Sequence, residues 1–282
     1  MTSSSIDIDY AALFGIHSLA GAVIFAILFF PLGLWFIRQS IRNTTYVYII
    51  LALFCAMRVT AYIIRAIMAN SVSEGSNLNL FIADQVLFGV GFFALLYSAY
   101  SLVLDRDVIA GGKGGSLLSP NPLRNPHAFR MILMAGVALS IVGTVDSTSS
   151  NPSDVSTGHT LRKAGTIIFF VLTVIQVAQS LWFFGHGSNL SKSGATHYFG
   201  DRNGRYLLCI ISLLMLVREV FLTATLNNST KQNDERLWYP LVALPEFLAV
   251  LCYAFSGLVP SRTDLKAARE TRESGSTQKV FT

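Results

Sequence analysis

Seven polar or charged side chains lie within segments that are otherwise apolar, and their types are suited to binding a ligand. They are Arg58, Arg65, Asp84, Gln85, Arg218, Glu219 and Glu246. An ionised side chain at the centre of a membrane helix costs at least about 2.5–3.5 kcal/mol on insertion scales, so such residues are usually paired or functional. These three cations and three anions could pair with one another, or could line a polar pocket for the head group of an amphiphile.

The expected depth of these groups favours particular pairs. At a rise of about 1.5 Å per residue, Arg65 and Asp84 lie within a turn of one membrane face, and the other four charges lie roughly 10–15 Å below it. We therefore expect Arg65 to pair with Asp84, and Glu246 to pair with Arg58 or Arg218. Salt bridges that only fix the packing of the helices account for the same residues, so both a structural role and a ligand pocket stay open.

The chain that carries these residues is too apolar for a soluble protein. Of its 282 residues, 52% are hydrophobic and 13% are charged, and its mean hydropathy is +0.52. Soluble proteins carry about 25% charged residues. This composition excludes a disordered chain, a disulfide scaffold and an ordinary cytosolic enzyme, and it is typical of an integral membrane protein.

Seven segments are long enough to cross a bilayer core, which needs about 20 apolar residues. They cover about 11–37, 46–68, 80–104, 128–148, 165–187, 205–226 and 239–259. The sequence therefore predicts an all-α polytopic membrane protein, a bundle of seven transmembrane helices over residues 11–259. The fourth segment is the least apolar, because Gly136, Ser140, Gly143 and Thr144 dilute it.

The distribution of lysine and arginine predicts the orientation. Of the 21 basic residues, fourteen lie in the tail and in the loops that follow the first, third and fifth segments, and four lie in the loops between them. Because cytoplasmic loops carry the excess of positive charge, we expect residues 1–10 outside and the tail, 260–282, in the cytoplasm. The membrane would be the plasma membrane or an endomembrane. The net charge of +5 follows from this bias, and no motif indicates a nucleic-acid partner.

Residue types that would indicate an enzyme or a cofactor are missing or scattered. The seventh segment has no lysine for a retinal Schiff base, and the five histidines do not fall at metal-ligand spacing. No serine, histidine and aspartate share a depth at which they could form a hydrolytic triad. We therefore expect no enzymatic activity, no cofactor and no metal site.

The connecting segments carry a few further features. The glycine-rich loop 105–127 and the tail are candidate regions for binding a cytoplasmic partner. Within the tail, a short helix from about 264 to 273 competes with a solvated segment, and we favour the solvated segment. Asn227 and Asn228 begin sequons on the expected outer side, so they are the candidate sites of a glycoprotein.

Four short motifs lie in the second half of the chain. They are Gly136-Val-Ala-Leu-Ser-Ile-Val-Gly143, Leu161-Arg-Lys-Ala-Gly165, Gly200-Asp-Arg202 and Leu216-Val-Arg-Glu219. In these motifs the chain resembles a group of uncharacterised fungal seven-span integral membrane proteins. More distantly, its arginine-containing second segment, Asp84-Gln85 and Arg218-Glu219 are similar to those of the fungal lipid-translocating exporter family. That resemblance implies movement of a lipid or amphiphile.

Three functions are therefore open. We expect translocation or export of a lipid-like or amphiphilic molecule, with the charged residues in contact with its head group. One alternative is a seven-helix surface sensor that binds an amphiphilic signal and acts through the loop 105–127 and the tail. The other is a membrane scaffold in which the buried ion pairs are purely structural.

Overall fold

The computed structural model describes residues 10–13, 15–109, 126–149, 151–186, 199–228, 231–232, 234–268 and 270. Within these residues, seven helical spans are long and apolar enough to cross a membrane. They are α2 (Leu19–Arg42), α3 (Tyr46–Asn70), α5 (Leu78–Ile109), α6 (Pro126–Asp146), α7 (Pro152–His186), α9 (Gly204–Ala224) and a seventh span built from α11 (Glu235–Trp238), η3 (Tyr239–Ala243) and α12 (Leu244–Tyr253). The predicted all-α bundle of seven transmembrane helices is confirmed.

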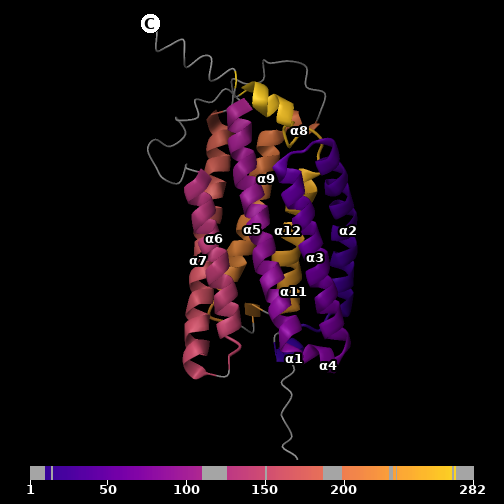
Figure 1. The fold of residues 1–282 in the computed structure, drawn as a ribbon, viewed down its shortest axis with the longest axis vertical. Coiled ribbons are helices and arrows are strands. Elements are labelled where there is room, and N and C mark those ends of the chain that lie inside the picture. The colour runs from indigo at the N-terminus through magenta and orange to yellow at the C-terminus, as the bar shows by residue number, and fades with distance from the viewer. Residues whose placement is uncertain are drawn as a thin grey trace, which may run out of the picture.

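The long helices stand side by side in one bundle (Figure 1). The central helix is α5, which packs against α3, α6, α7 and α9. In its apolar stretch 67% of the residues are buried, against 22% for the peripheral α2. We call the end that carries α1 (Tyr10–Leu13) and α4 (Val72–Gly75) the α1 end, and the opposite end, with α8 (Phe199–Arg202), the α8 end.

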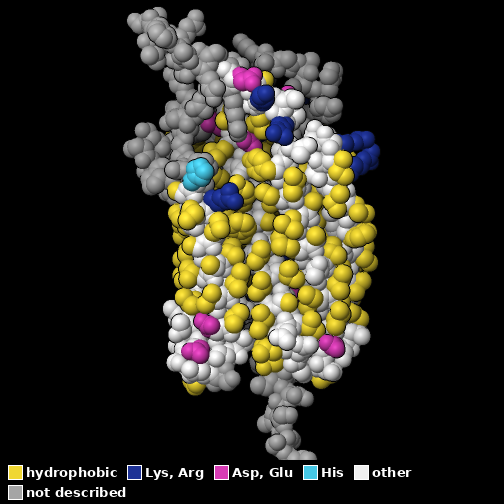
Figure 2. Space-filling model, in the orientation of Figure 1, with side chains coloured by type: hydrophobic (Ala, Val, Ile, Leu, Met, Phe, Trp, Pro, Cys, Tyr) yellow, Lys and Arg dark blue, Asp and Glu magenta, His cyan; other side chains and the backbone are white. Residues whose placement is uncertain are grey.

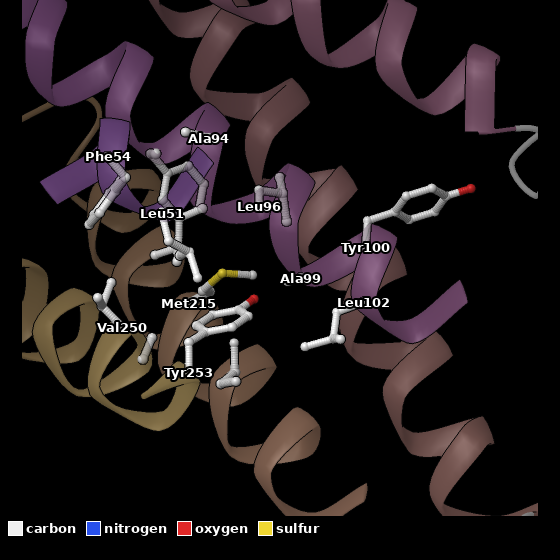
Figure 3. Packing of buried hydrophobic residues seen from close by; sticks show 14 of the residues in the cluster. Leu51, Phe54, Ala94, Leu96, Ala99, Tyr100, Leu102, Met215, Val250 and Tyr253 are labelled. Carbon is white, nitrogen blue, oxygen red and sulfur yellow. The ribbon is translucent and has the colours of Figure 1, made fainter. Parts of the chain in front are cut away.

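The apolar core lies where α3, α5, α9 and α12 meet (Figure 3). Leu51 of α3, Leu96 of α5 and Tyr253 of α12 are inaccessible to solvent, and Met215 of α9 is nearly so. Lipid tails are as apolar as these side chains, so close packing rather than release of water holds the helices together. This packing fixes how the four helices sit relative to one another.

Small residues allow α6 and α7 to pack backbone against backbone. A Cβ atom added to Gly143 of α6 would lie 2.5 Å from the backbone nitrogen of Arg162, and one added to Gly165 of α7 would collide with the side chain of Ser140. Such close approach through small residues is a common way for membrane helices to associate. The residues that dilute the apolar character of the fourth segment therefore form its contact with α7.

Two helices extend beyond the spans expected from sequence. α7 begins at Pro152 rather than near 165, with the side chain of Asn151 accepting a hydrogen bond from the backbone N–H of Ser153. Proline suits the first position of a helix, where its missing N–H has no partner to lose. α5 runs on to Ile109, so the first residues of the expected loop 105–127 are helical; its glycine-rich residues 110–125 lie outside the described residues.

The seventh span is interrupted and shifted towards the N-terminus. It runs from Glu235 to Tyr253, whereas the sequence predicts 239–259. Pro240 and Pro245 each remove a backbone donor, which explains why a π-helical turn, η3, interrupts the α-helix here: it contains Pro240 and ends shortly before Pro245. Residues 254–259 form turns, and Gly257 adopts a left-handed backbone with φ 87°.

The two ends of the chain also differ from expectation. The first predicted span, 11–37, is divided into α1 and α2 by a turn at Gly15, where φ is 68°. In the tail, residues 262–268 are helical, and Lys266 Nζ lies 3.7 Å from Glu270 Oε1. The structure thus has the short helix rather than the fully solvated segment that we favour from sequence.

The surface agrees with a membrane environment. Figure 2 shows a broad band of hydrophobic side chains around the middle of the bundle. On this face the lysine and arginine side chains lie towards the α8 end, whereas aspartate and glutamate side chains are seen at both ends.

Candidate functional site

The carboxylate of Glu246 on α12 joins both of the arginines between which the sequence leaves a choice. It accepts hydrogen bonds from Arg58 Nε and Nη2, each at 2.7 Å, in a two-pronged arrangement. Arg218 Nε of α9 lies 2.6 Å from Glu246 Oε1, and Arg218 also pairs with its neighbour Glu219. All four side chains are buried, so this group of two cations and two anions is balanced in charge.

Arg58 also binds the backbone of the central helix. Its Nη1 donates to the carbonyl oxygen of Leu87 and its Nη2 to that of Phe88, both at 3.1 Å. Gly91 makes this approach possible, because a Cβ atom there would lie 2.6 Å from Arg58 Nη1. Arg58, itself fully buried, therefore connects α3, α5 and α12.

The predicted pair between Arg65 of α3 and Asp84 of α5 is confirmed. Arg65 Nε donates to Asp84 Oδ1 at 3.0 Å, and Nη2 donates to Oδ2 at 3.2 Å. The next residue, Gln85, donates from Nε2 to Asp84 Oδ2 at 3.2 Å and accepts at Oε1 from Arg162 Nη2 at 3.4 Å. A continuous polar chain thus runs from α3 through α5 to α7.

Arg162 belongs to the site but is not predicted from the sequence, because it falls in a segment that is expected to be an outer loop. Among the described residues no ion pair of Arg162 is present, and its side-chain hydrogen bond goes to Gln85. The available signal is spacing: Gly158, Arg162 and Gly165 lie four and three residues apart, on one face of a helix. The two glycines of this face pack against α6.

Several of these side chains line a cavity of about 120 Å³. Its wall includes Arg65 near the end of α3 and Gln85 near the start of α5, so it lies in the half of the bundle nearer the α1 end, where α4 joins these two helices. Four of the seven predicted ligand-binding residues line it, namely Arg65, Gln85, Arg218 and Glu219. Arg58, Asp84 and Glu246 are not among its lining residues. Asp84 pairs with the lining Arg65, and Glu246 pairs with the lining Arg218. The rest of the wall includes Arg162, Gln232, Phe88, Gly89, Phe92, Ser140, Thr144, Thr166, Leu222 and Trp238.

Aromatic rings cover the arginine groups on the apolar side. The ring centroid of Phe88 lies 4.6 Å from Arg58 Cζ and 4.3 Å from Arg65 Cζ, and Trp238 lies 3.8 Å from Arg65 Cζ. Cations attract the faces of aromatic rings, more strongly where water is excluded. Together with the carboxylates, these rings offset part of the cost of holding arginine at this depth.

The candidate glycosylation sites lie apart from the cavity wall. Asn227 and Asn228 are exposed in the turn that follows α9. Glycosylation at these residues stays a prediction. Within the described part of the chain, no three His, Cys, Asp or Glu side chains are grouped so that they could hold a metal ion.

A protein-family model matches most of this chain. It is described as "Domain of unknown function (DUF7702)", and it matches residues 15–261, which include all seven spans. No curated protein and no solved structure matches the sequence. Since the match covers far more than half of the chain, the protein belongs to the DUF7702 family.

Proposed function

We propose that this protein translocates or exports a lipid-like or amphiphilic molecule without converting it chemically, and that the cavity near the α1 end binds the polar head group. The observation that carries the proposal is the cavity itself, which has arginine, glutamate and glutamine side chains in its wall inside an otherwise apolar bundle. Charged side chains inside membrane helices usually mark a substrate path or a pairing site.

The size of the cavity fits part of an amphiphile rather than a whole one. Pockets that enclose a complete drug-sized ligand measure about 300–1,000 Å³. At about 120 Å³, this cavity is closer to one that holds a single small ring, about 150 Å³. A head group would enter the cavity, and its hydrocarbon chain would stay in an apolar environment outside it.

With the orientation expected from the lysine and arginine residues, this cavity would lie in the outer half of the membrane. The excess of lysine and arginine in the loops and tail at the α8 end favours a cytoplasmic location for that end. The cavity would then receive its ligand from the outer leaflet or the exterior. The resemblance to the fungal lipid-translocating exporter family supports the same kind of substrate.

A cavity-filling substitution tests the proposal. Gly89 lines the cavity, and a Cβ atom added to it meets no other atom within 4 Å, so Gly89→Leu should fill the space without disturbing the fold. Gly185→Leu is the matched control, because Gly185 of α7 also has open space around its Cβ position and is not part of the wall. Neither change alters a charge.

The measurement is the movement of a fluorescent phospholipid between the two leaflets of proteoliposomes. Dithionite added outside bleaches only the label in the outer leaflet, so the bleached fraction reports this movement. The wild-type protein and Gly185→Leu should expose label from the inner leaflet, and Gly89→Leu should not. Equal movement by both variants, or none by the wild-type protein, would reject translocation through this cavity.

A sensor is favoured by a different contact. Arg106 of α5 binds the backbone carbonyls of Gly257 and Leu258, which follow α12, at the α8 end. The same two helices carry Gln85 and Glu246 of the site, so a ligand could change their packing at the far end. If deletion of residues 108–124 abolishes a cellular response while ligand binding is kept, the sensor is supported; a scaffold predicts no ligand binding at all.

A further inference from the structure

We infer that the cavity selects an oxyanion, a phosphate or carboxylate group, and that Arg162 is the residue that selects it. This inference rests on the proposed function only in that a lipid head group is one source of such a group. A free anion is the other source. The argument comes from the charge balance, the hydrogen bonds and the size of the cavity.

One of the arginines at the site has no carboxylate to balance its charge among the described residues. Four arginines belong to the site, and three carboxylates face them: Asp84 pairs with Arg65, while Glu219 and Glu246 pair with the other two buried arginines. Arg162 has no carboxylate partner among the described residues, and its side chain contacts the neutral amide of Gln85. A bound anion would supply the missing charge.

The hydrogen bonds of the cavity wall also indicate that the ligand is an anion. The hydroxyl groups of Ser140, Thr144 and Thr166 line the cavity, but each donates its proton to a backbone carbonyl of its own helix. The protons of these hydroxyl groups are therefore already used within the helices. Arg162 has five N–H donors, and within the described part of the chain it uses one of them, at 3.4 Å, for Gln85. The spare donors of the cavity wall thus come chiefly from a guanidinium, whose fork matches carboxylate and phosphate oxygens.

The volume is suited to this class of group. A cavity of about 150 Å³ holds benzene, which has six heavy atoms. Phosphate has five heavy atoms and carboxylate has three, so either fits a cavity of about 120 Å³. A bulky choline or sugar head group would have to remain partly outside.

Two substitutions remove the uncompensated charge by different routes. Arg162→Gln deletes the cation, and Gln85→Glu keeps it but gives it a fixed carboxylate partner of nearly the same shape. Arg162→Lys is the conservative variant. Lys163→Gln is the control, because Lys163 is the next residue on α7 and is exposed to the surroundings.

The test is binding to the purified full chain in detergent, followed by tryptophan fluorescence, since Trp238 lies in the cavity wall. The probes are dioctanoyl phosphatidic acid, dioctanoyl phosphatidylcholine and inorganic phosphate. Wild type and Lys163→Gln should bind phosphatidic acid at least tenfold more tightly than phosphatidylcholine. Arg162→Gln and Gln85→Glu should both lose this preference, and Arg162→Lys should keep part of it.

The outcomes separate this inference from the proposed function. Equal affinity of the wild type for both lipids, or a full preference kept by Arg162→Gln, overturns the selection of an oxyanion and leaves lipid binding intact. Saturable binding of phosphate without binding of either lipid supports the oxyanion site and rejects the lipid proposal. Competition between phosphate and phosphatidic acid supports both. If no probe binds, both are wrong.

Discussion

Arg58 and Gly91 depend on each other, because the guanidinium lies where a larger residue on α5 would place its side chain. A Cβ atom at Gly91 would come within 2.6 Å of Arg58 Nη1 and 2.9 Å of its Cζ. The guanidinium cannot move away freely, since it is held by Glu246 and by two carbonyl oxygens of α5. One glycine therefore permits the Arg58–Glu246 ion pair, whose two side chains are fully buried.

We expect Gly91→Ala to destabilise the protein by about 1–3 kcal/mol, the usual cost of overpacking a core. Gly89→Ala is the control, because its new Cβ meets open space and alanine is favoured over glycine in a helix by about 0.5–1 kcal/mol. Thermal unfolding in detergent measures both. A Gly91→Ala protein as stable as Gly89→Ala would show that Arg58 does not need this space.

Glu246→Gln should be the most damaging single change at the site. It leaves Arg58 and Arg218 facing a neutral amide, and breaking a buried ion pair costs about 3–5 kcal/mol. Glu270→Gln provides the comparison, because the Lys266–Glu270 pair is exposed and such pairs contribute about 0.3–0.5 kcal/mol. The stability of each variant in detergent is the measurement. Similar losses for the two substitutions would contradict the buried network.

The contact between α6 and α7 should tolerate an added methyl group at one glycine and not at another. The new Cβ of Gly143→Ala meets backbone atoms of Arg162 and Gly158, which cannot rotate away, whereas that of Gly136→Ala meets the side chain of Ile168 at 3.0 Å. We expect Gly143→Ala to lower the unfolding temperature more than Gly136→Ala does. Gly143→Ala should also weaken anion binding, since it displaces α7 at Arg162. The reverse order of stability would exclude this packing.

At the α8 end, Arg106→Lys should loosen the turn after α12. Arg106 donates to the carbonyl of Leu258 from Nε at 2.9 Å and from Nη2 at 2.8 Å, and it also pairs with Asp201 at 2.9 Å. Lysine keeps the charge but cannot reach these acceptors with a planar fork. Hydrogen–deuterium exchange across residues 254–260 should rise several-fold, with exchange at the cavity unchanged. Unaltered exchange in the turn would rule out this role.

The sequence predicts the contact between residues on helices that follow one another along the chain. Arg65 and Asp84 lie near the ends of two successive helices joined by a short connection, so their pairing follows from depth alone. The sequence could not predict that Glu246 pairs with both Arg58 and Arg218. The depth of a residue in the membrane does not reveal which helices are neighbours across the bundle. That arrangement arises from the packing of α3, α5, α9 and α12.

The sequence also misleads where polarity and secondary structure diverge. The residues from 152 to 164 are polar enough to suggest a loop, yet they continue α7, and this carries Arg162 into the site. Hydropathy measures the preference of a segment for lipid, whereas a helix at the end of a bundle also needs small residues to pack against. Gly158 and Gly165 supply them. The spacing of these two glycines with Arg162 is the feature of the sequence that indicates this helical face.

Labelling of a thiol in the cavity tests the central claim most directly. Gly89→Cys is made in a chain whose own cysteines, Cys55, Cys209 and Cys252, are replaced by alanine, and Gly185→Cys serves as the control. We predict that dioctanoyl phosphatidic acid slows the reaction of the Gly89→Cys thiol with a charged methanethiosulfonate at least several-fold, and leaves the control unchanged. An equal rate with and without the lipid would contradict a head-group site in this cavity.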